Sequence, residues 1–302
     1  MPAPRVVAIV GPTAAGKSEL AIALALRLGG EVINTDAMQV YRGMDVGTAK
    51  QPVERRRGVA HHLLDLMEVT EPASVAVFQS LARAQIARLH SLGQVPVLVG
   101  GSALYTRAIL DVIDFPGTDP VVRATYEARL QKIGATELHR ELAEIDPEAA
   151  ASIEPLNGRR IVRALEVIEL TGSPFKAVLP ELTYHYPGAV QIGLRLPREV
   201  LDLRIEQRVE QMWASGLVDE VRCLGPALAT SLTASRAIGY AQVLAFLRGE
   251  IDETEAQRQV VVATRRFVRR QDAWFLKDPR IHWLEADAAD LVDQAVNVIS
   301  RD

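Results

Sequence analysis

The residues of this chain whose types and spacing could do chemistry begin with a glycine-rich loop near the N-terminus. Eight consecutive residues satisfy the pattern G-x-x-x-x-G-K-[ST] at every defined position: Gly11, Pro12, Thr13, Ala14, Ala15, Gly16, Lys17 and Ser18. In such a loop the glycines let the backbone approach a phosphate, main-chain N–H groups point at the anion, and the lysine adds a positive charge. The Ser18 hydroxyl is the predicted Mg²⁺ ligand. The pattern predicts a phosphate-binding P-loop; the structural alternative is a tight strand-to-helix turn with a surface lysine.

The P-loop alone does not specify a reaction, because kinases, ATPases and GTPases all bind a diphosphate and Mg²⁺ in this way. A nucleoside triphosphatase ordinarily adds an apolar strand that ends in a magnesium-positioning Asp. Here the apolar stretch 95–99 is followed by Gly100, Gly101 and Ser102, without a carboxylate. Asp36, after an earlier apolar segment, is the remaining candidate. The absence of a carboxylate after 95–99 favours a function other than nucleotide hydrolysis but does not exclude hydrolysis.

An alternation of strands and helices must position this loop. Residues 6–10 form an apolar, β-branched run directly before it, which predicts a buried parallel strand. The helix expected after the loop ends at the glycine pair 29–30, a usual C-terminal signal. Short strands at 32–33 and 95–99 and a helix at about 75–92 continue the pattern. We therefore predict an α/β fold with a P-loop-type parallel sheet flanked by helices.

The character of the chain changes after residue 116. Asp-Pro, Glu-Pro and Ser-Pro pairs punctuate amphipathic helical stretches, and no convincing strand lies among them. A strand-like segment at 190–196 and helices near 199–215, 218–224 and 255–276 then resume the core. We expect three segments: 1–116 as the first part of the P-loop core, 117–187 as a helical insertion domain, and 188–302 as the core continuation with C-terminal helices.

Composition excludes several classes of protein. The chain has 302 residues, of which 48% are hydrophobic and 24% charged, enough for a full core and a second small domain. A net charge of −4 argues against indiscriminate coating of nucleic acid. Cys223 is the single cysteine, so no intramolecular disulfide forms. Without a signal peptide or an apolar run of about 20 residues, we expect a cytoplasmic protein that needs no membrane. No obligate protein partner is evident.

Several ordered segments resemble the bacterial tRNA dimethylallyltransferase (tRNA isopentenyltransferase) family over nearly the whole chain. Besides the P-loop, the matching segments are Asn-Thr-Asp-Ala-Met-Gln-Val-Tyr from Asn34, Gly-Met-Asp-Val-Gly-Thr-Ala-Lys from Gly43, His-His-Leu-Leu-Asp from His61, Val-Gly-Gly-Ser-Ala-Leu-Tyr from Val99, Arg-Ala-Leu-Glu-Val from Arg163, Arg-Ile-Glu-Gln-Arg-Val from Arg204 and Ala-Ile-Gly-Tyr from Ala237. Agreement of so many segments at once is far more specific than the P-loop alone.

The resemblance implies a reaction. Dimethylallyl pyrophosphate would donate its five-carbon group to N6 of the adenosine 3′ of the anticodon in tRNA, with release of pyrophosphate. A P-loop would then hold a prenyl diphosphate, and its N–H groups, Lys17 and Mg²⁺ would meet the charge on the leaving group. An ATP-binding label for the loop would describe its ancestry better than its ligand.

The resemblance also implies catalytic roles for Asp36, Thr13 and Arg208. Asp36 would be the general base, because an adenine amine is a weak nucleophile until a carboxylate takes its proton; the alternative is an N-cap for a following helix. Thr13 would hydrogen-bond substrate or steady the turn. Arg208 would reach the pyrophosphate, with an ordinary salt bridge to Glu206 or Glu210 as the alternative.

A further set corresponds to the family's tRNA contacts, and the insertion would be its tRNA-binding domain, for the anticodon stem-loop. These positions are Asp36, Ala37, Met38, Gln39, Ser102, Arg123, Arg159, Arg160, Arg163, Arg236, Gly239 and Tyr240. Ser102 has a competing use as a helix N-cap, and the arginines could be a solvated helix face. One departure is Ala241, where related enzymes can carry Arg.

Three other functions remain as alternatives. An adenylate prenyltransferase forms the same bond on a free nucleotide, although it has no need of a helical insertion. A P-loop kinase or NTPase would transfer phosphate or hydrolyse nucleotide. A non-catalytic RNA-binding module would keep the loop without releasing pyrophosphate.

Overall fold

The computed structural model describes residues 5–176 and 180–301, which form two compact units. The larger contains the chain up to Asp111 and from Tyr184 onward, and the smaller is Val112–Thr183. The smaller unit corresponds to the expected insertion 117–187, with both bounds nearer the N-terminus. Tyr184 lies in the larger unit because it forms a β-bridge with Asp111 and its hydroxyl accepts a hydrogen bond from Gln191 Nε2 at 3.0 Å.

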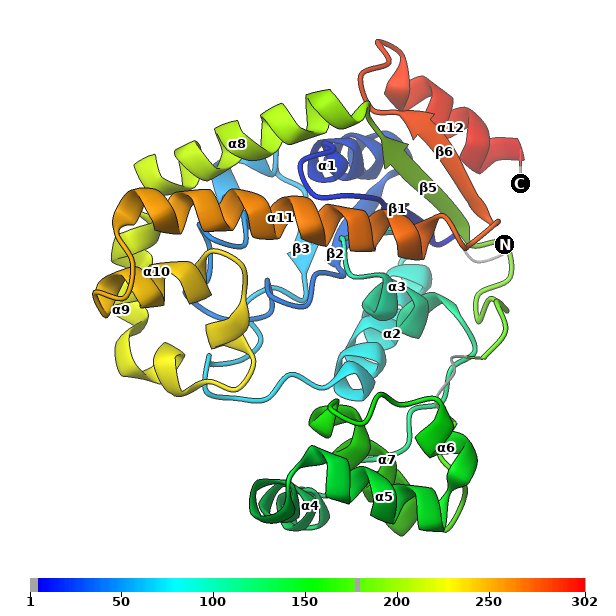
Figure 1. Ribbon diagram of the computed structural model, residues 1–302. Coiled ribbons are helices and arrows are strands. Elements are labelled where there is room, and N and C mark those ends of the chain that lie inside the picture. Colours follow the sequence, from blue (N-terminus) through cyan, green and yellow to red (C-terminus); the bar gives the residue numbers. More distant parts are fainter. Residues whose placement is uncertain (1–4, 177–179, 302) are drawn as a thin grey trace. The chain divides into compact units, whose positions relative to one another are not determined.

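The larger unit is an α/β fold built on six parallel strands in the order β3-β2-β4-β1-β5-β6 (Figure 1). Its strands are β1 (Val7–Val10), β2 (Gly30–Asn34), β3 (His61–His62), β4 (Val95–Val99), β5 (Val190–Arg195) and β6 (Ile281–Glu285). Its helices are α1 (Lys17–Leu28), α2 (Val75–Ser91), α3 (Ala103–Leu110), α8 (Arg198–Ala214), α9 (Leu217–Thr230), α10 (Tyr240–Leu247), α11 (Glu253–Phe275) and α12 (Leu291–Arg301), with short 3₁₀ turns η1 (Val53–Arg55) and η2 (Ala234–Arg236). The predicted fold class, a parallel sheet flanked by helices, is confirmed.

Alternation along β1 explains how the sheet is covered. Ala8 and Val10 face a cluster that contains residues of α2 and α3, while Val7 and Ile9 face a cluster that contains residues of α1 and α12. All four side chains are fully buried, as expected for a central strand between two helical layers. β1, β2 and β4 each contribute side chains to both cores.

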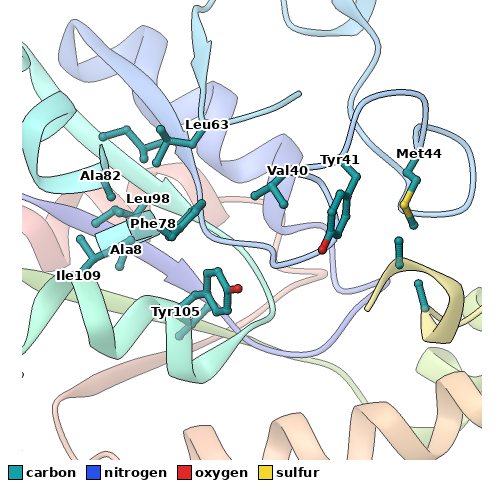
Figure 2. Packing of buried hydrophobic residues seen from close by; sticks show 14 of the residues in the cluster. Ala8, Val40, Tyr41, Met44, Leu63, Phe78, Ala82, Leu98, Tyr105 and Ile109 are labelled. Carbon is teal, nitrogen blue, oxygen red and sulfur yellow. The ribbon is translucent and has the colours of Figure 1, made fainter. Parts of the chain in front are cut away.

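Figure 2 shows the first of these cores. Ala8 and Leu98 of the sheet lie beside Phe78 of α2 and Tyr105 of α3. The Phe78 and Tyr105 rings meet edge to face with centroids 4.8 Å apart, a favoured aromatic arrangement. This packing holds α3 and the loop before it against the sheet.

The carboxyl ends of β1, β2 and β4 meet at one edge of the sheet, because these strands are parallel neighbours. The P-loop follows β1, Asp36 follows β2, and Gly100 follows β4. A Cβ on Gly100 would lie 2.2 Å from Thr35 Oγ1 and 2.8 Å from the Asp36 nitrogen. Ligands of open α/β sheets bind at this edge.

A group of ion pairs in the larger unit joins Asp111 and Tyr184, the residues at which the chain leaves this unit and returns to it. Arg280 donates to Asp111 (Nη1–Oδ1 2.8 Å) and Asp278 (Nη2–Oδ2 2.7 Å), and its guanidinium lies 4.0 Å from the centroid of the Tyr184 ring. The Asp111 side chain is fully buried. The pairing charges are therefore what permits a carboxylate at this position.

Helices are the only secondary-structure elements among the described residues of the smaller unit, which has its own apolar core. It consists of α4 (Pro120–Ile133), α5 (Ala135–Ile145), α6 (Pro147–Ala151) and α7 (Gly158–Thr171). Leu138 and Leu142 of α5 pack with Ile161 and Leu165 of α7. The Asp-Pro pairs start α4 and α6, where each Asp accepts N-terminal N–H groups and each Pro takes the first helical position.

Among the described residues, no helix has the length and apolar character needed to cross a bilayer.

Candidate active site

A cavity of about 700 Å³ lies at the carboxyl edge of the sheet in the larger unit. The P-loop, the turns after β2 and β4, residues 45–52, α8 and α11 all contribute to its lining. Asp36, Lys17 and Arg208 are among the lining side chains. The structure therefore brings the three predicted catalytic residues Asp36, Thr13 and Arg208 together around one space, although 195 positions separate Thr13 from Arg208.

The P-loop has the conformation that an anion site needs. Gly16 stands at the N-cap of α1 with φ +86°, and Ala14 also has a positive φ of 65°. Gly11 has φ +122°, and a Cβ there would approach the Leu194 carbonyl oxygen to 2.7 Å. The N-terminus of α1 and the preceding amides thus lie at the cavity, where they favour negative charge.

Two cations lie beside this loop. Lys17 Nζ donates to the Pro12 carbonyl oxygen at 2.6 Å and keeps two further protons for a ligand. Burial, and then the charge of Arg208, lowers the pKa of Lys17 to about 7, against the opposing effects of Asp36 and Asp272. Arg208 Nη1 donates to Thr13 Oγ1 at 3.2 Å. Arg208 is therefore directed at the P-loop, and the alternative salt bridge to Glu206 or Glu210 does not form.

Asp36 is held by its neighbours. Its main-chain N–H donates to Asn34 Oδ1 at 2.8 Å, and its carbonyl oxygen accepts from Asn34 Nδ2 at 3.0 Å. Its Oδ1 accepts the Met38 N–H at 2.9 Å. No helix follows Asp36, so the alternative role as an N-cap is wrong. The carboxylate closes a turn with Oδ1, and Oδ2 makes no hydrogen bond to the described residues.

The turn after β4 supports the segment that follows Asp36. Ser102 stands at the N-cap position of α3, but its hydroxyl makes no capping hydrogen bond there. Ser102 Oγ instead accepts the Ala37 N–H at 3.2 Å. Gln39, which also lines the cavity, donates Nε2–H to the Thr48 carbonyl oxygen at 3.1 Å. Ser102 thus supports the segment 37–39, of which Gln39 lines the cavity.

Glu220 of α9 is a residue that sequence reasoning missed. Its carboxylate accepts the main-chain N–H groups of Asp45 (2.9 Å), Val46 (2.7 Å) and Gly47 (3.2 Å), as well as the Tyr240 hydroxyl at 2.5 Å. These bonds fix the loop that forms one wall of the cavity. A signal did exist, because Gly47 and Tyr240 both lie in family-like segments, but no pattern links them to α9.

Lys50 and Gln271 were also missed. Lys50 is buried and donates to the Tyr41 carbonyl oxygen at 3.0 Å, to Asp65 Oδ1 at 2.6 Å, and to Asp45. Gln271 of α11 is buried beside the P-loop. Both side chains line the cavity.

The remaining expected tRNA contacts in the larger unit differ in exposure. Arg236, at the end of η2, is exposed. Gly239 is buried, and the Tyr240 side chain is fully buried with its hydroxyl on Glu220. A contact from Tyr240 to RNA in this conformation would have to use the main chain.

The four arginines expected to contact tRNA in the smaller unit divide into two kinds. Arg123 and Arg163 both bind the fully buried Glu166, at 3.3 and 2.9 Å. Arg163 also donates to the carbonyl oxygens of Pro116 and Gly117. Arg159 and Arg160, at the start of α7, are exposed. The exposed pair is therefore the part of the expected basic face that is most accessible.

The parallel sheet, the P-loop and the carboxylate and guanidinium beside it define a P-loop α/β enzyme that acts on a phosphate-bearing substrate. A family model described as IPP transferase matches residues 39–278. The chain is 61% identical over 300 residues to a tRNA dimethylallyltransferase of Thermobifida fusca, covering 97% of this chain and 94% of that protein. The chain therefore belongs to the IPP transferase family.

Solved structures agree with this assignment. The chain is 40% identical to the full-length tRNA isopentenylpyrophosphate transferase of Bacillus halodurans, with a TM-score of 0.71 and coverage of 98% of this chain and 95% of that one. It is 25% identical to a eukaryotic dimethylallyltransferase captured acting on tRNA, with a TM-score of 0.80 and coverage of 99% and 77%.

Proposed function

We propose that this chain transfers the dimethylallyl group of dimethylallyl pyrophosphate to N6 of the adenosine 3′ of the anticodon in tRNA, releasing pyrophosphate. The observation that carries the proposal is the meeting of the P-loop, Asp36 and Arg208 at one cavity. Relatives named tRNA dimethylallyltransferase or tRNA isopentenylpyrophosphate transferase support the same reaction. A tRNA substrate would place the enzyme in the cytoplasm.

The P-loop is the proposed seat of the donor's pyrophosphate. The amides at the start of α1, Lys17 and Arg208 all present positive charge to the cavity. These groups stabilise the negative charge that grows on the leaving pyrophosphate more than they stabilise the bound donor, and this difference lowers the barrier. Thr13, held by Arg208, lies where it can accept or donate a further hydrogen bond to the donor.

Asp36 is the proposed general base. The bond between C1 of the dimethylallyl group and the bridging oxygen breaks, and its electron pair leaves with pyrophosphate. A bond forms between that carbon and the adenosine N6, and one N6 proton moves to Asp36. Since Oδ1 is engaged by the Met38 N–H, Oδ2 is the oxygen assigned to this proton.

Mg²⁺ fits the site as an ion shared with the substrate. The described residues contain no cluster of three or more His, Cys, Asp or Glu that could enclose a metal. Mg²⁺ is usually held by one or two protein groups together with phosphate oxygens and water. Ser18, which lines the cavity next to Lys17, would hold it through its hydroxyl. The ion would supply positive charge against the leaving pyrophosphate.

The acceptor tRNA would meet residues 36–39 and Ser102, of which Asp36 and Gln39 line the cavity. An exposed cationic stripe on α11, formed by Arg266, Arg269 and Arg270, is suited to RNA phosphates. Arg270 lies 5.9 Å from the centroid of the Phe267 ring, and Phe267 lines the cavity. Local basic surface of this kind reconciles RNA binding with a net charge of −4.

One assay tests the function against its alternatives. Purified protein is offered dimethylallyl pyrophosphate with hypomodified tRNA, with AMP, or with neither, and ATP is supplied in a parallel reaction. We expect a five-carbon mass gain on tRNA adenosine and stoichiometric pyrophosphate. Modification of AMP alone would indicate an adenylate prenyltransferase, and ATP hydrolysis without prenyl product would indicate an NTPase. tRNA binding without product would indicate a non-catalytic module.

A further inference from the structure

Gln271 occupies a position that packing alone does not explain. Val268, Gln271 and Phe275 of α11 are spaced by three and four residues and lie on the same buried face of the helix. Gln271 is 4% exposed, as is Phe275, and Val268 is fully buried. An amide at such a position is costly unless its polar atoms are hydrogen-bonded, so an apolar residue is the ordinary occupant.

Both polar atoms of Gln271 bond to the donor site. Its Oε1 accepts the Thr13 N–H at 3.0 Å, and its Nε2 donates to the Gly101 carbonyl oxygen at 2.9 Å. The amide therefore links the P-loop to the turn after β4, although the two segments lie far from α11 in sequence.

The absence of a side chain at Gly101 leaves room for the Gln271 amide. A Cβ on Gly101 would lie 2.2 Å from Gln271 Nε2 and 3.8 Å from Lys17 Nζ. The glycine thus supplies the space that the Gln271 side chain fills, and the two residues form a complementary pair.

Thr13 is consequently fixed at two of its groups. Its N–H is used by Gln271 and its hydroxyl by Arg208. The Thr13 N–H is unavailable to an anion in this conformation, so the amides that follow it in the loop are left to bind phosphate. The Gln271 contact therefore selects which main-chain donors face the cavity.

We infer that Gln271, seated against Gly101, is a positioning residue that holds the P-loop in its diphosphate-binding conformation. The inference rests on the proposed function for its setting, since it concerns the donor end of that same site. Gln271 does not touch the reacting atoms; it acts through Thr13.

A double-mutant cycle on the full-length protein tests the pairing. Dissociation constants for inorganic pyrophosphate are measured by calorimetry for wild type, Gln271→Ala, Gly101→Ala and the double variant. We expect Gln271→Ala to weaken pyrophosphate binding about tenfold, since each lost hydrogen bond contributes a few-fold to about tenfold. Gly101→Ala should be at least as damaging alone, because its methyl displaces Nε2. In the Gln271→Ala background, the same methyl should change binding by less than about threefold.

Steady-state kinetics supply a readout that a merely structural role would not move. For Gln271→Ala we expect the donor KM to rise while the tRNA KM stays within about twofold of wild type. If the two substitutions weaken pyrophosphate binding by independent factors that multiply in the double variant, the inference is overturned. A Gln271→Ala variant that is less stable but binds pyrophosphate normally would also overturn it. If the wild type transfers no prenyl group, the proposed function fails, whereas the pyrophosphate cycle still decides the role of Gln271.

Discussion

Arg208 Nη1 donates to Thr13 Oγ1 at 3.2 Å, and this bond joins α8 to the P-loop. The same guanidinium lines the cavity, so it can bridge the loop and a bound pyrophosphate. A group that contacts both the loop and the leaving group should influence binding and chemistry together.

Arg208→Gln should therefore lower kcat/KM for the donor by about 10- to 100-fold, since a hydrogen bond to a charged group contributes about 1.5–3 kcal/mol. Both the donor KM and kcat should change, because the leaving group's charge grows in the transition state. Two changes at Thr13 test its bond to Arg208. Thr13→Val removes the hydroxyl, and Thr13→Ser, which keeps it, is the matched control. Wild-type kinetics in Arg208→Gln would show that Arg208 does not reach the donor.

Asp36→Asn removes the proposed base with little change of shape. The Asn side chain can still accept the Met38 N–H, so the turn should persist. We expect the single-turnover rate of prenyl transfer to fall about 10²- to 10⁴-fold, as is typical for loss of a general base. Donor binding should change little. An undiminished single-turnover rate would assign proton removal to another group.

Gly100→Ala should displace the base without altering it. The new Cβ would meet Thr35 Oγ1 at 2.2 Å, the Thr35 carbonyl carbon at 2.6 Å and the Asp36 nitrogen at 2.8 Å. Because two of these atoms are main chain, the turn after β2 must move. We expect at least about a 10²-fold loss of kcat, since an error of about 1 Å in position can cost that much. Gly117→Ala, whose Cβ meets nothing within 4 Å, is the control.

Donor affinity should depend on the protonation of Lys17. Its pKa is lowered to about 7 chiefly by burial, whereas an unfolded lysine titrates near 10.4. Between these values the unfolded chain binds more protons, so the Lys17 contribution makes the free energy of unfolding rise with pH. Pyrophosphate binding has the opposite dependence, because the anion favours the charged lysine. Its affinity should fall about tenfold per pH unit above about pH 7.

Calorimetry at about pH 8, in Tris and in HEPES, measures the proton taken up when pyrophosphate binds. Lys17→Arg keeps its charge throughout this range and should abolish the uptake. Equal proton uptake in Lys17→Arg and wild type would place the titrating group elsewhere.

Glu220→Gln should loosen the wall of the cavity formed by residues 45–47. The Gln side chain has one acceptor oxygen in place of the two carboxylate oxygens. Its NH₂ group would face main-chain N–H donors, with which it cannot bond. We expect a loss of about 1–3 kcal/mol in the free energy of unfolding, measured by urea denaturation. Tyr240→Phe removes one hydrogen bond and keeps the ring against Gly47, so its loss should be smaller. A larger loss in Tyr240→Phe would contradict this account.

Much of the fold was predictable because it depends on local patterns. The β-branched run of β1, the P-loop and the glycine that ends α1 are contiguous signals, and β1, β2, β4 and β5 form where the apolar segments predicted them. The two strands that were missed are edge strands. β3 has two residues, and His282 of β6 is exposed while Trp283 and Leu284 are half-buried, so neither has the continuous apolar run of a central strand.

The site was predictable only where its chemistry is carried by a motif. Gly11 through Ser18 and Asp36 stand in segments whose residue types identify them. Gln271 and Glu220 do not, because a glutamine or glutamate within a helix has the same local pattern whether it faces solvent or another loop. Their roles depend on bonds across 258 and about 174 positions of sequence, which only the fold brings together.

The bridge between Asp111 and Tyr184, reinforced by Arg280, gives the larger unit a modular character. Asp111 and Tyr184, which flank Val112–Thr183 in sequence, lie side by side, and the charges that join them belong to the larger unit alone. A few residues of linker could therefore replace Val112–Thr183 without opening the sheet. The residues that line the diphosphate cavity all belong to the larger unit, so Val112–Thr183 could be exchanged for another segment while that cavity is kept.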